Sequence, residues 1–224
     1  MFVDPKVAEY FSSEAVLYKV NGDIDTAVAR RFCVSGFPTL VMLGSDGNEI
    51  DRVAGYLPPD EFLQTFRDYG KGIGTLASMV GKAKDSVDRN LYMQIAEKYK
   101  YGCDKAAAVE WYGKVIAAGK PTDSLSGVSR MELADILRRA KKYDSAVLAY
   151  QKVAKDFKKT SFASDADWYL GDVYRRMKDT AKAIKAFETW MTKYPKADTS
   201  EVSYTKGLIE KLKNPPAPKP EEKK

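Results

Sequence analysis

Three short stretches decide the fold of this chain: IAEKY (residues 95–99), LADIL (residues 133–137) and LGDVY (residues 170–174). They begin 38 and 37 residues apart, and a recurrence of that length is typical of repeat architectures. Each is followed at the same distance by an alanine and, four positions later, by an aromatic residue: Ala108 and Tyr112, Ala146 and Tyr150, Ala183 and Phe187. Small residues let two helices approach, and the aromatic rings fill the space between neighbouring pairs. The pattern therefore predicts paired helices from Leu76 onward.

These positions resemble the tetratricopeptide repeat, in which leucine, glycine or alanine, tyrosine, alanine, an aromatic residue and proline recur through paired helices. Pro195 closes the third repeat, whereas Lys158 stands at the closing position of the second. The loops PTDSLSG (residues 121–127) and KKTSFAS (residues 158–164) account for the long period. One more amphipathic helix, at residues 200–213, is expected to cap the array. The resemblance implies an all-α solenoid of three helix pairs plus a capping helix.

Before the repeats, the hydrophobic period changes several times, which is typical of a mixed α/β unit. The sequence predicts a strand at AVLYKV (residues 15–20) and a short helix that is capped by Asp23 or Asp25 and ends near Phe32. It also predicts an antiparallel hairpin, because Asp46-Gly47 marks a tight turn between TLVML (residues 39–43) and EIDRV (residues 49–53). A further helix begins at the two prolines Pro58 and Pro59.

The stretches GFPTLVML (residues 36–43) and EIDRVAGYLPPDEF (residues 49–62) resemble the second half of a thioredoxin-like domain. The resemblance implies that Pro38 is the family's cis proline, between Phe37, whose backbone would face a bound substrate, and Thr39. In that family the redox cysteines and the central strand precede the matching region. The chain is therefore expected to be either a fragment or a domain in which something else fills the gap.

Gly70, Gly72 and Gly74 separate the two patterns and suit a hinge. We expect an α+β multidomain chain with a partial thioredoxin-like domain at residues 1–72 and a tetratricopeptide-like domain at residues 73–213. The last part, residues 214–224, contains four prolines and no aliphatic side chain larger than alanine, so we expect a disordered tail.

Composition restricts the chemistry. The chain of 224 residues has no histidine, which excludes Ser-His and Cys-His catalysis and the common zinc sites, so we expect no metal and no cofactor. The two cysteines, Cys33 and Cys103, lie in different predicted domains and form no C-x-x-C motif. We therefore expect two unrelated thiols without catalytic disulfide exchange.

Charge and hydropathy bear on partners and location. The net charge is −4 up to Gly72 and +10 afterwards. The later Lys and Arg residues alternate with acidic ones along the predicted helices, a pattern that does not favour nucleic acid. No 18-residue apolar window and no signal peptide occur. As written, the chain is expected to be soluble and cytoplasmic, with a periplasmic location if an upstream segment with a signal peptide is missing.

The resemblance to the tetratricopeptide repeat implies that the first helix of each pair lines a groove. Residues at equal depth on these helices form three ladders, which are the candidate peptide groove: Met93, Met131 and Trp168; Glu97, Asp135 and Asp172; Lys100, Arg138 and Arg175. One interpretation is an apolar stripe between opposite charges, suited to an extended or helical peptide. The other is that each acid pairs with the base three residues later on its own helix, while the large side chains belong to the core.

Two functions follow. The first is a protein–protein interaction scaffold in which repeats are attached to a thioredoxin-like remnant. The alternative is a fragment of a thiol-disulfide oxidoreductase or redox chaperone whose C-x-x-C lies upstream of Met1.

Overall fold

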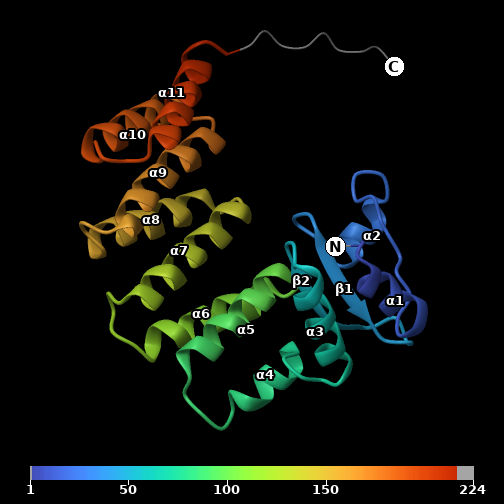
Figure 1. The fold of residues 1–224 in the computed structure, drawn as a ribbon. Coiled ribbons are helices and arrows are strands. Elements are labelled where there is room, and N and C mark those ends of the chain that lie inside the picture. The colour runs from blue at the N-terminus through green and yellow to red at the C-terminus, as the bar shows by residue number, and fades with distance from the viewer. Residues whose placement is uncertain (1, 216–224) are drawn as a thin grey trace. The chain divides into compact units, whose positions relative to one another are not determined.

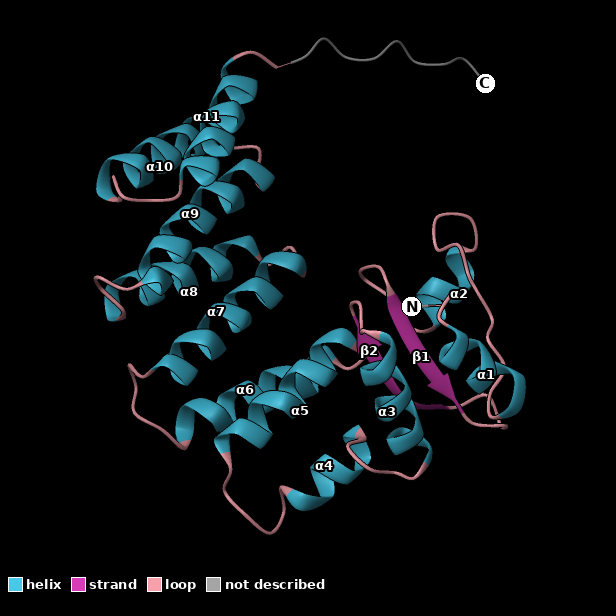
Figure 2. Cartoon of the chain, in the orientation of Figure 1, coloured by secondary structure: helices cyan, strands magenta, loops and turns pink. Residues whose placement is uncertain are grey.

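The computed structural model describes residues 2–215, so the predicted tail lies largely outside the described residues (Figure 1). The chain divides into two compact units, Met1–Gly119 and Lys120–Lys224. Helices dominate both units, and one two-stranded sheet lies in the first (Figure 2). None of the helices in the described part of the chain is long and apolar enough to span a membrane.

The first unit begins with a small α/β region. Its elements are α1 (Pro5–Ser13), α2 (Thr26–Arg31), β1 (Thr39–Leu43), β2 (Glu49–Ala54) and α3 (Pro59–Gly70). Asp4 and Asp25 begin the first two helices, because each carboxylate accepts a backbone N–H of the first turn. The strands form an antiparallel hairpin, and Gly47 supplies the positive φ of 76° that its turn requires.

The core of this region lies between the hairpin and helices α1 and α3. Val7 and Tyr10 of α1 pack with Phe62, Leu63 and Phe66 of α3, and all five are buried. Leu40 and Met42 of β1 contact the same cluster. These two residues alternate along the strand, so one face of the sheet points to this core.

The strand expected at residues 15–20 is absent, and that prediction was wrong: the segment has no regular secondary structure. A β-strand is stabilised by hydrogen bonds to a neighbouring strand. No described backbone group bonds residues 16–20, so their β-forming side chains do not suffice to make a strand.

The first unit continues with α4 (Leu76–Lys82), α5 (Arg89–Tyr101) and α6 (Lys105–Ala117). Helices α5 and α6 pack together through Ile95, Ala96, Ala108 and Tyr112, which are completely buried. The alanines of the repeat pattern therefore lie where two helices come close.

The second unit consists of α7 (Ser124–Arg139), α8 (Tyr143–Asp156), α9 (Ser161–Arg176), α10 (Thr180–Lys193) and α11 (Thr199–Lys213). Small residues are required between the helices here too, since a Cβ on Gly171 would lie 2.5 Å from the Phe187 ring. Ile209 of α11 covers Ala183 and Phe187, as expected of a capping helix. The predicted fold class is confirmed: a thioredoxin-like α/β part precedes three helix pairs and a final helix.

Candidate functional site

The predicted cis-proline position lies at the entrance to β1. The Phe37–Pro38 peptide bond is cis in the structure. The Thr39 hydroxyl donates a hydrogen bond to the Gly36 carbonyl oxygen at 2.7 Å. Phe37 is 66% exposed, so an apolar residue stands at the surface beside the start of the strand.

An apolar cavity of about 710 Å³ adjoins this position. Its walls come from α1, residues 15–20, α2, β1 and α3, and the Phe37 ring contributes to the rim. Glu14 is the one charged residue among the described residues that line it. Such a lining suits an uncharged, apolar occupant.

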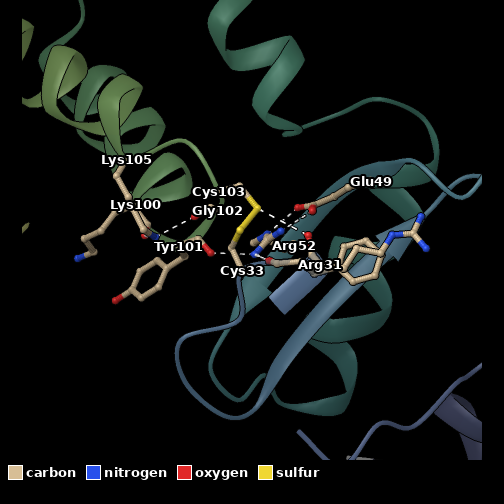
Figure 3. Close-up of a disulfide and its surroundings, with 10 residues drawn as sticks. Arg31, Cys33, Glu49, Arg52, Lys100, Tyr101, Gly102, Cys103 and Lys105 are labelled. Carbon is tan, nitrogen blue, oxygen red and sulfur yellow. Dashed lines mark hydrogen bonds and ion pairs between the residues drawn. A yellow bond between two sulfur atoms is a disulfide. The ribbon is translucent and has the colours of Figure 1, made fainter. Parts of the chain in front are cut away.

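Cys33 and Cys103 form a disulfide with a Cα–Cα distance of 5.2 Å (Figure 3). The expectation of two unrelated thiols was therefore wrong. It failed because Cys33 follows α2 whereas Cys103 follows α5, and only the packing of α5 beside the hairpin brings the two together. Cys103 is exposed and Cys33 is half-buried, so solvent reaches the crosslink.

Arg52 ties together the same two backbone segments (Figure 3). Its guanidinium Nη1 donates to the carbonyl oxygens of Phe32 and Tyr101, at 2.7 and 2.8 Å. Glu49 neutralises the guanidinium through both carboxylate oxygens. Arg52 is 5% exposed, and a buried guanidinium needs such complete pairing.

A second buried pair joins the hairpin to the middle of α5. Lys98 Nζ donates to Asp51 Oδ1 at 2.7 Å and to the Tyr69 hydroxyl at 2.9 Å. The other oxygen of Asp51 accepts the backbone N–H of Leu76. Asp51 is 4% exposed, so its charge depends on these partners.

The sequence did not point to this junction. Asp51 and Arg52 belong to the EIDRV strand, in which they look like ordinary surface charges, and Lys98 is one of many lysines on the helices. One signal was available in the sequence. Neighbouring strand residues point to opposite faces of a sheet, so Asp51 and Arg52 could not both face solvent if one face is covered.

In the second unit, four of the ladder residues form one ionic network. Arg138 pairs with Asp135 of its own helix and, at 2.9 Å, with Asp172 of α9. Asp172 also accepts hydrogen bonds from Arg175 at 3.1 Å and from Arg176 at 2.7 Å. The pairs three residues apart are thus present in both helices, as the second interpretation of the ladders requires, and Arg138 adds a bond between repeats.

Burial disfavours the charged form of Asp172, but the hydrogen bonds from Arg176 and Arg175 outweigh it, so the pKa of Asp172 lies below its ordinary value. Asp172 is 3% exposed. Its carboxylate is therefore a fixed centre of the network.

Trp168 is half-buried under the capping helix. Its indole Nε1 donates to the Thr205 hydroxyl at 2.9 Å, and its ring lies 5.6 Å from that of Phe187. Tyr204 stacks on the same ring at 6.3 Å. These contacts place Trp168 in the packing between α9, α10 and α11.

The remaining ladder residues are more separate. Met131 is half-buried against the core of α7, α8 and α9. Met93, Glu97 and Lys100 lie on α5 in the first unit, where Glu97 is exposed and Lys100 Nζ lies 4.7 Å from the centre of the Tyr101 ring. Within residues 2–215, no group of three acidic or cysteine side chains could hold a metal ion.

The fold and these sites define a helical-repeat protein that carries a small α/β region. Residues 75–212 match the family model described as a tetratricopeptide repeat-like domain, and residues 1–70 match that of a thioredoxin-like domain. Because the first match covers more than half of the chain, the chain belongs to the tetratricopeptide repeat-like family. The predicted order of the two domains is confirmed. No curated protein matches the chain.

Proposed function

We propose that the chain is a protein–protein interaction scaffold that holds an extended or helical peptide on its tetratricopeptide-like domain, residues 73–213. Membership of the repeat family supports a role in protein binding. The observation that carries the proposal is the ionic network across α7 and α9, because it fixes a charged surface before any partner arrives. A preorganised surface loses less conformational entropy on binding.

The chemistry of this surface favours a particular ligand. Four arginines share two aspartates, and three of the arginines remain accessible: Arg139 is 65%, Arg176 43% and Arg175 37% exposed. A partner carboxylate would find guanidinium groups with free donors there. Met131, which precedes Asp135 by four positions on α7, would supply an apolar contact. We infer a peptide that combines an apolar anchor with an acidic side chain.

Under this proposal the ladder residues have two roles. Met131 and Arg175 would touch the peptide, whereas Asp135, Arg138 and Asp172 would hold the arginines in position. Trp168 would stabilise the end of the array. Met93, Glu97 and Lys100 of α5 lie in the first unit and are proposed as candidate peptide contacts of that unit by itself.

Binding can be tested with peptides selected from a random library against the full chain. Fluorescence anisotropy of the best labelled peptide should show about tenfold weaker binding to Arg175→Glu, because the charge reversal repels the acidic side chain. Lys152→Glu is the matched control, since it makes the same charge change on α8 at a 62% exposed side chain. Equal affinity for the two variants would contradict the proposal.

The match of residues 1–70 to a thioredoxin-like domain favours a second candidate, a fragment of a thiol-disulfide oxidoreductase or redox chaperone. Reading the codons upstream of Met1 in frame for a strand followed by C-x-x-C separates the two candidates. An insulin-reduction assay adds a biochemical test. We expect a rate no higher than that of the added reductant alone. A faster rate that is lost in Cys33→Ser would contradict the scaffold proposal, whereas a faster rate that appears only when upstream residues with C-x-x-C are restored would establish the second candidate.

A further inference from the structure

Aromatic side chains connect helices α9 and α11 in the second unit. Tyr204 follows Trp168 by 36 positions, and the two rings stack with their centres 6.3 Å apart. Tyr169 meets the Trp168 ring edge-on at 5.3 Å. The indole N–H of Trp168 is taken by Thr205, but Tyr204 is 61% exposed. An exposed aromatic residue therefore stands where the two helices meet.

Two carboxylates lie one helical turn before these rings. Asp165 precedes Trp168 by three positions on α9, and Glu201 precedes Tyr204 by three positions on α11, so each acid shares a helix face with a ring. The two acids are 36 positions apart, as the two rings are, so they stand at the same depth on the two helices. Both are exposed, and within residues 2–215 neither carboxylate forms an ion pair.

The two charges repel each other. Partial desolvation raises the pKa of Asp165 above its ordinary value, and the negative charge of Glu201 adds to this effect. Asp167, two positions further along α9, has a cation as partner, since Lys193 Nζ lies 2.6 Å from its carboxylate. A cation bound between Asp165 and Glu201 would remove their repulsion in the same way.

The combination of rings and carboxylates selects the occupant. A guanidinium group stacks on aromatic faces and pairs with carboxylates through a fixed fork of N–H donors. The chain shows this arrangement beside the site: the Arg138 guanidinium lies 5.3 Å from the centre of the Tyr169 ring and is neutralised by Asp135 and Asp172. An apolar side chain would leave the two carboxylates without a partner, and an anion would be repelled by them.

We propose that Asp165, Glu201 and Tyr204 form a binding site for the guanidinium group of an arginine in a partner polypeptide. The carboxylates would accept its N–H groups, and the tyrosine ring would support one face of its plane. The site uses none of the arginines of α7 and α9 and takes a ligand group of the opposite charge. That the arginine belongs to a polypeptide rests on the proposed role in protein binding, whereas the preference for a cation does not.

The test adds the capped tripeptide acetyl-Gly-Arg-Gly-amide to the ¹⁵N-labelled full chain and follows the indole N–H signal of Trp168 and the amide signal of Tyr204 by NMR. We expect saturable shifts. The same tripeptide with citrulline in place of arginine keeps the shape of the side chain but loses its charge. It should bind at least about tenfold more weakly.

A second measurement reports on the carboxylate itself. The arginine tripeptide should lower the pKa of Asp165, followed by ¹³C NMR, because a bound cation favours the charged form of the carboxyl group. The citrulline tripeptide should leave this pKa unchanged. A purely structural role of Asp165 would not make its pKa depend on the charge of the peptide.

Two variants remove the two parts of the site. The double variant Asp165→Asn/Glu201→Gln should bind the arginine tripeptide at least about tenfold more weakly, and circular dichroism should show an unchanged fold because both side chains are exposed. Tyr204→Leu keeps an apolar side chain without the ring and should bind about threefold more weakly. The matched controls should bind normally: Asp144→Asn, at an exposed acid in the first turn of α8, and Tyr56→Leu, at a 64% exposed tyrosine of the first unit.

Equal binding of the two tripeptides, or normal binding by the double variant, would overturn the proposal. Sedimentation adds a further outcome. A dimer that the double variant dissociates would also overturn the proposal, because the arginine would then come from a second copy of the chain.

Arg175→Glu separates this site from the proposed function. Arg175 follows Asp165 by ten positions on α9, which is about 15 Å along a helix and exceeds the screening length of about 10 Å in 0.1 M salt. This variant should therefore bind the arginine tripeptide normally while it loses the selected acidic peptides. If it keeps the acidic peptides, the proposed function fails and the guanidinium site is unaffected. A loss of the arginine tripeptide in this variant would contradict a separate site.

Discussion

The two units hold their parts together in different ways. In Met1–Gly119, the contacts that join the hairpin to α5 link residues far apart in sequence: 47 positions for Lys98–Asp51, 49 for Arg52–Tyr101 and 70 for the disulfide. In Lys120–Lys224, the ionic network links residues three or four positions apart and one neighbour 34 positions away. The repeats of the second unit therefore depend on contacts between neighbouring helices, whereas the α/β part depends on a few contacts between residues distant in sequence.

Breaking the disulfide should have the largest effect. In Cys33→Ser the unfolded chain regains the freedom of a 70-residue loop, so the first unit should lose about 4 kcal/mol of unfolding free energy. Guanidinium unfolding followed by circular dichroism measures the change. Wild-type chain in dithiothreitol should behave like the variant, and a midpoint that reductant does not move would contradict the prediction.

Removing the buried carboxylate of Asp51 should cost about 3 kcal/mol, because Asp51→Ala leaves the Lys98 ammonium buried without its counter-charge. Thermal unfolding of Asp60→Ala provides the control. Asp60 also pairs with a lysine, Lys6, but its side chain is 80% exposed, so the loss should be below about 1 kcal/mol. Similar losses of unfolding free energy in both variants would show that the buried Asp51–Lys98 pair stabilises the first unit no more than an exposed pair does.

The nearest-neighbour contacts of the second unit can be tested by overpacking. Ala146→Leu should destabilise this unit by about 2 kcal/mol, since Ala146 is completely buried between helices. Ala181→Leu, at an exposed alanine on α10, should change stability by less than about 0.5 kcal/mol. Hydrogen exchange would locate the loss of stability, and faster exchange in the amides of the first unit would contradict a dependence on neighbouring helices alone.

Acid should weaken the ionic network, with the smallest effect of the four. The folded pKa of Asp172 is lowered, so its stabilisation is present above the ordinary carboxyl pKa and is lost as pH falls through the folded value. Asp172→Asn should therefore cost about 1 kcal/mol at pH 7 and make the stability of the second unit less dependent on pH below 4. Urea unfolding at pH 7 and pH 3 measures both effects, and an identical pH dependence in the two proteins would contradict the assignment.

The difference between contacts that are close and contacts that are distant in sequence explains what the sequence could predict. The repeats are visible because Ala108, Ala146 and Ala183 recur with the helix pairs, and the hairpin is visible because its turn residues are local. The pairing of Cys33 with Cys103 could not be predicted, since it depends on how α5 packs beside the hairpin. Strand propensity alone predicted a strand at residues 15–20, but a strand sequence forms a strand only where a partner edge is available.

For the candidate sites, the sequence placed the ladder residues on common helix faces but could not tell contact surface from core. Trp168 has the same place in the pattern as Met131, yet Trp168 is hydrogen-bonded to Thr205 of the capping helix, whereas Met131 is half-buried against the core of α7, α8 and α9. The domain limits at residues 72 and 213 remain a prediction from the sequence pattern. The buried pairs of Asp51 and Arg52 depend on tertiary burial that composition does not encode.

The crosslink between Cys33 and Cys103 also changes the covalent topology of the chain. It closes a ring that contains the hairpin, α3, α4 and α5, and the glycine-rich stretch at residues 70–74 lies inside this ring. A protease that cuts once in this stretch would therefore open the ring without releasing a fragment. While the disulfide is intact, the α/β part and the repeats stay one molecule even after their connecting peptide has been cleaved.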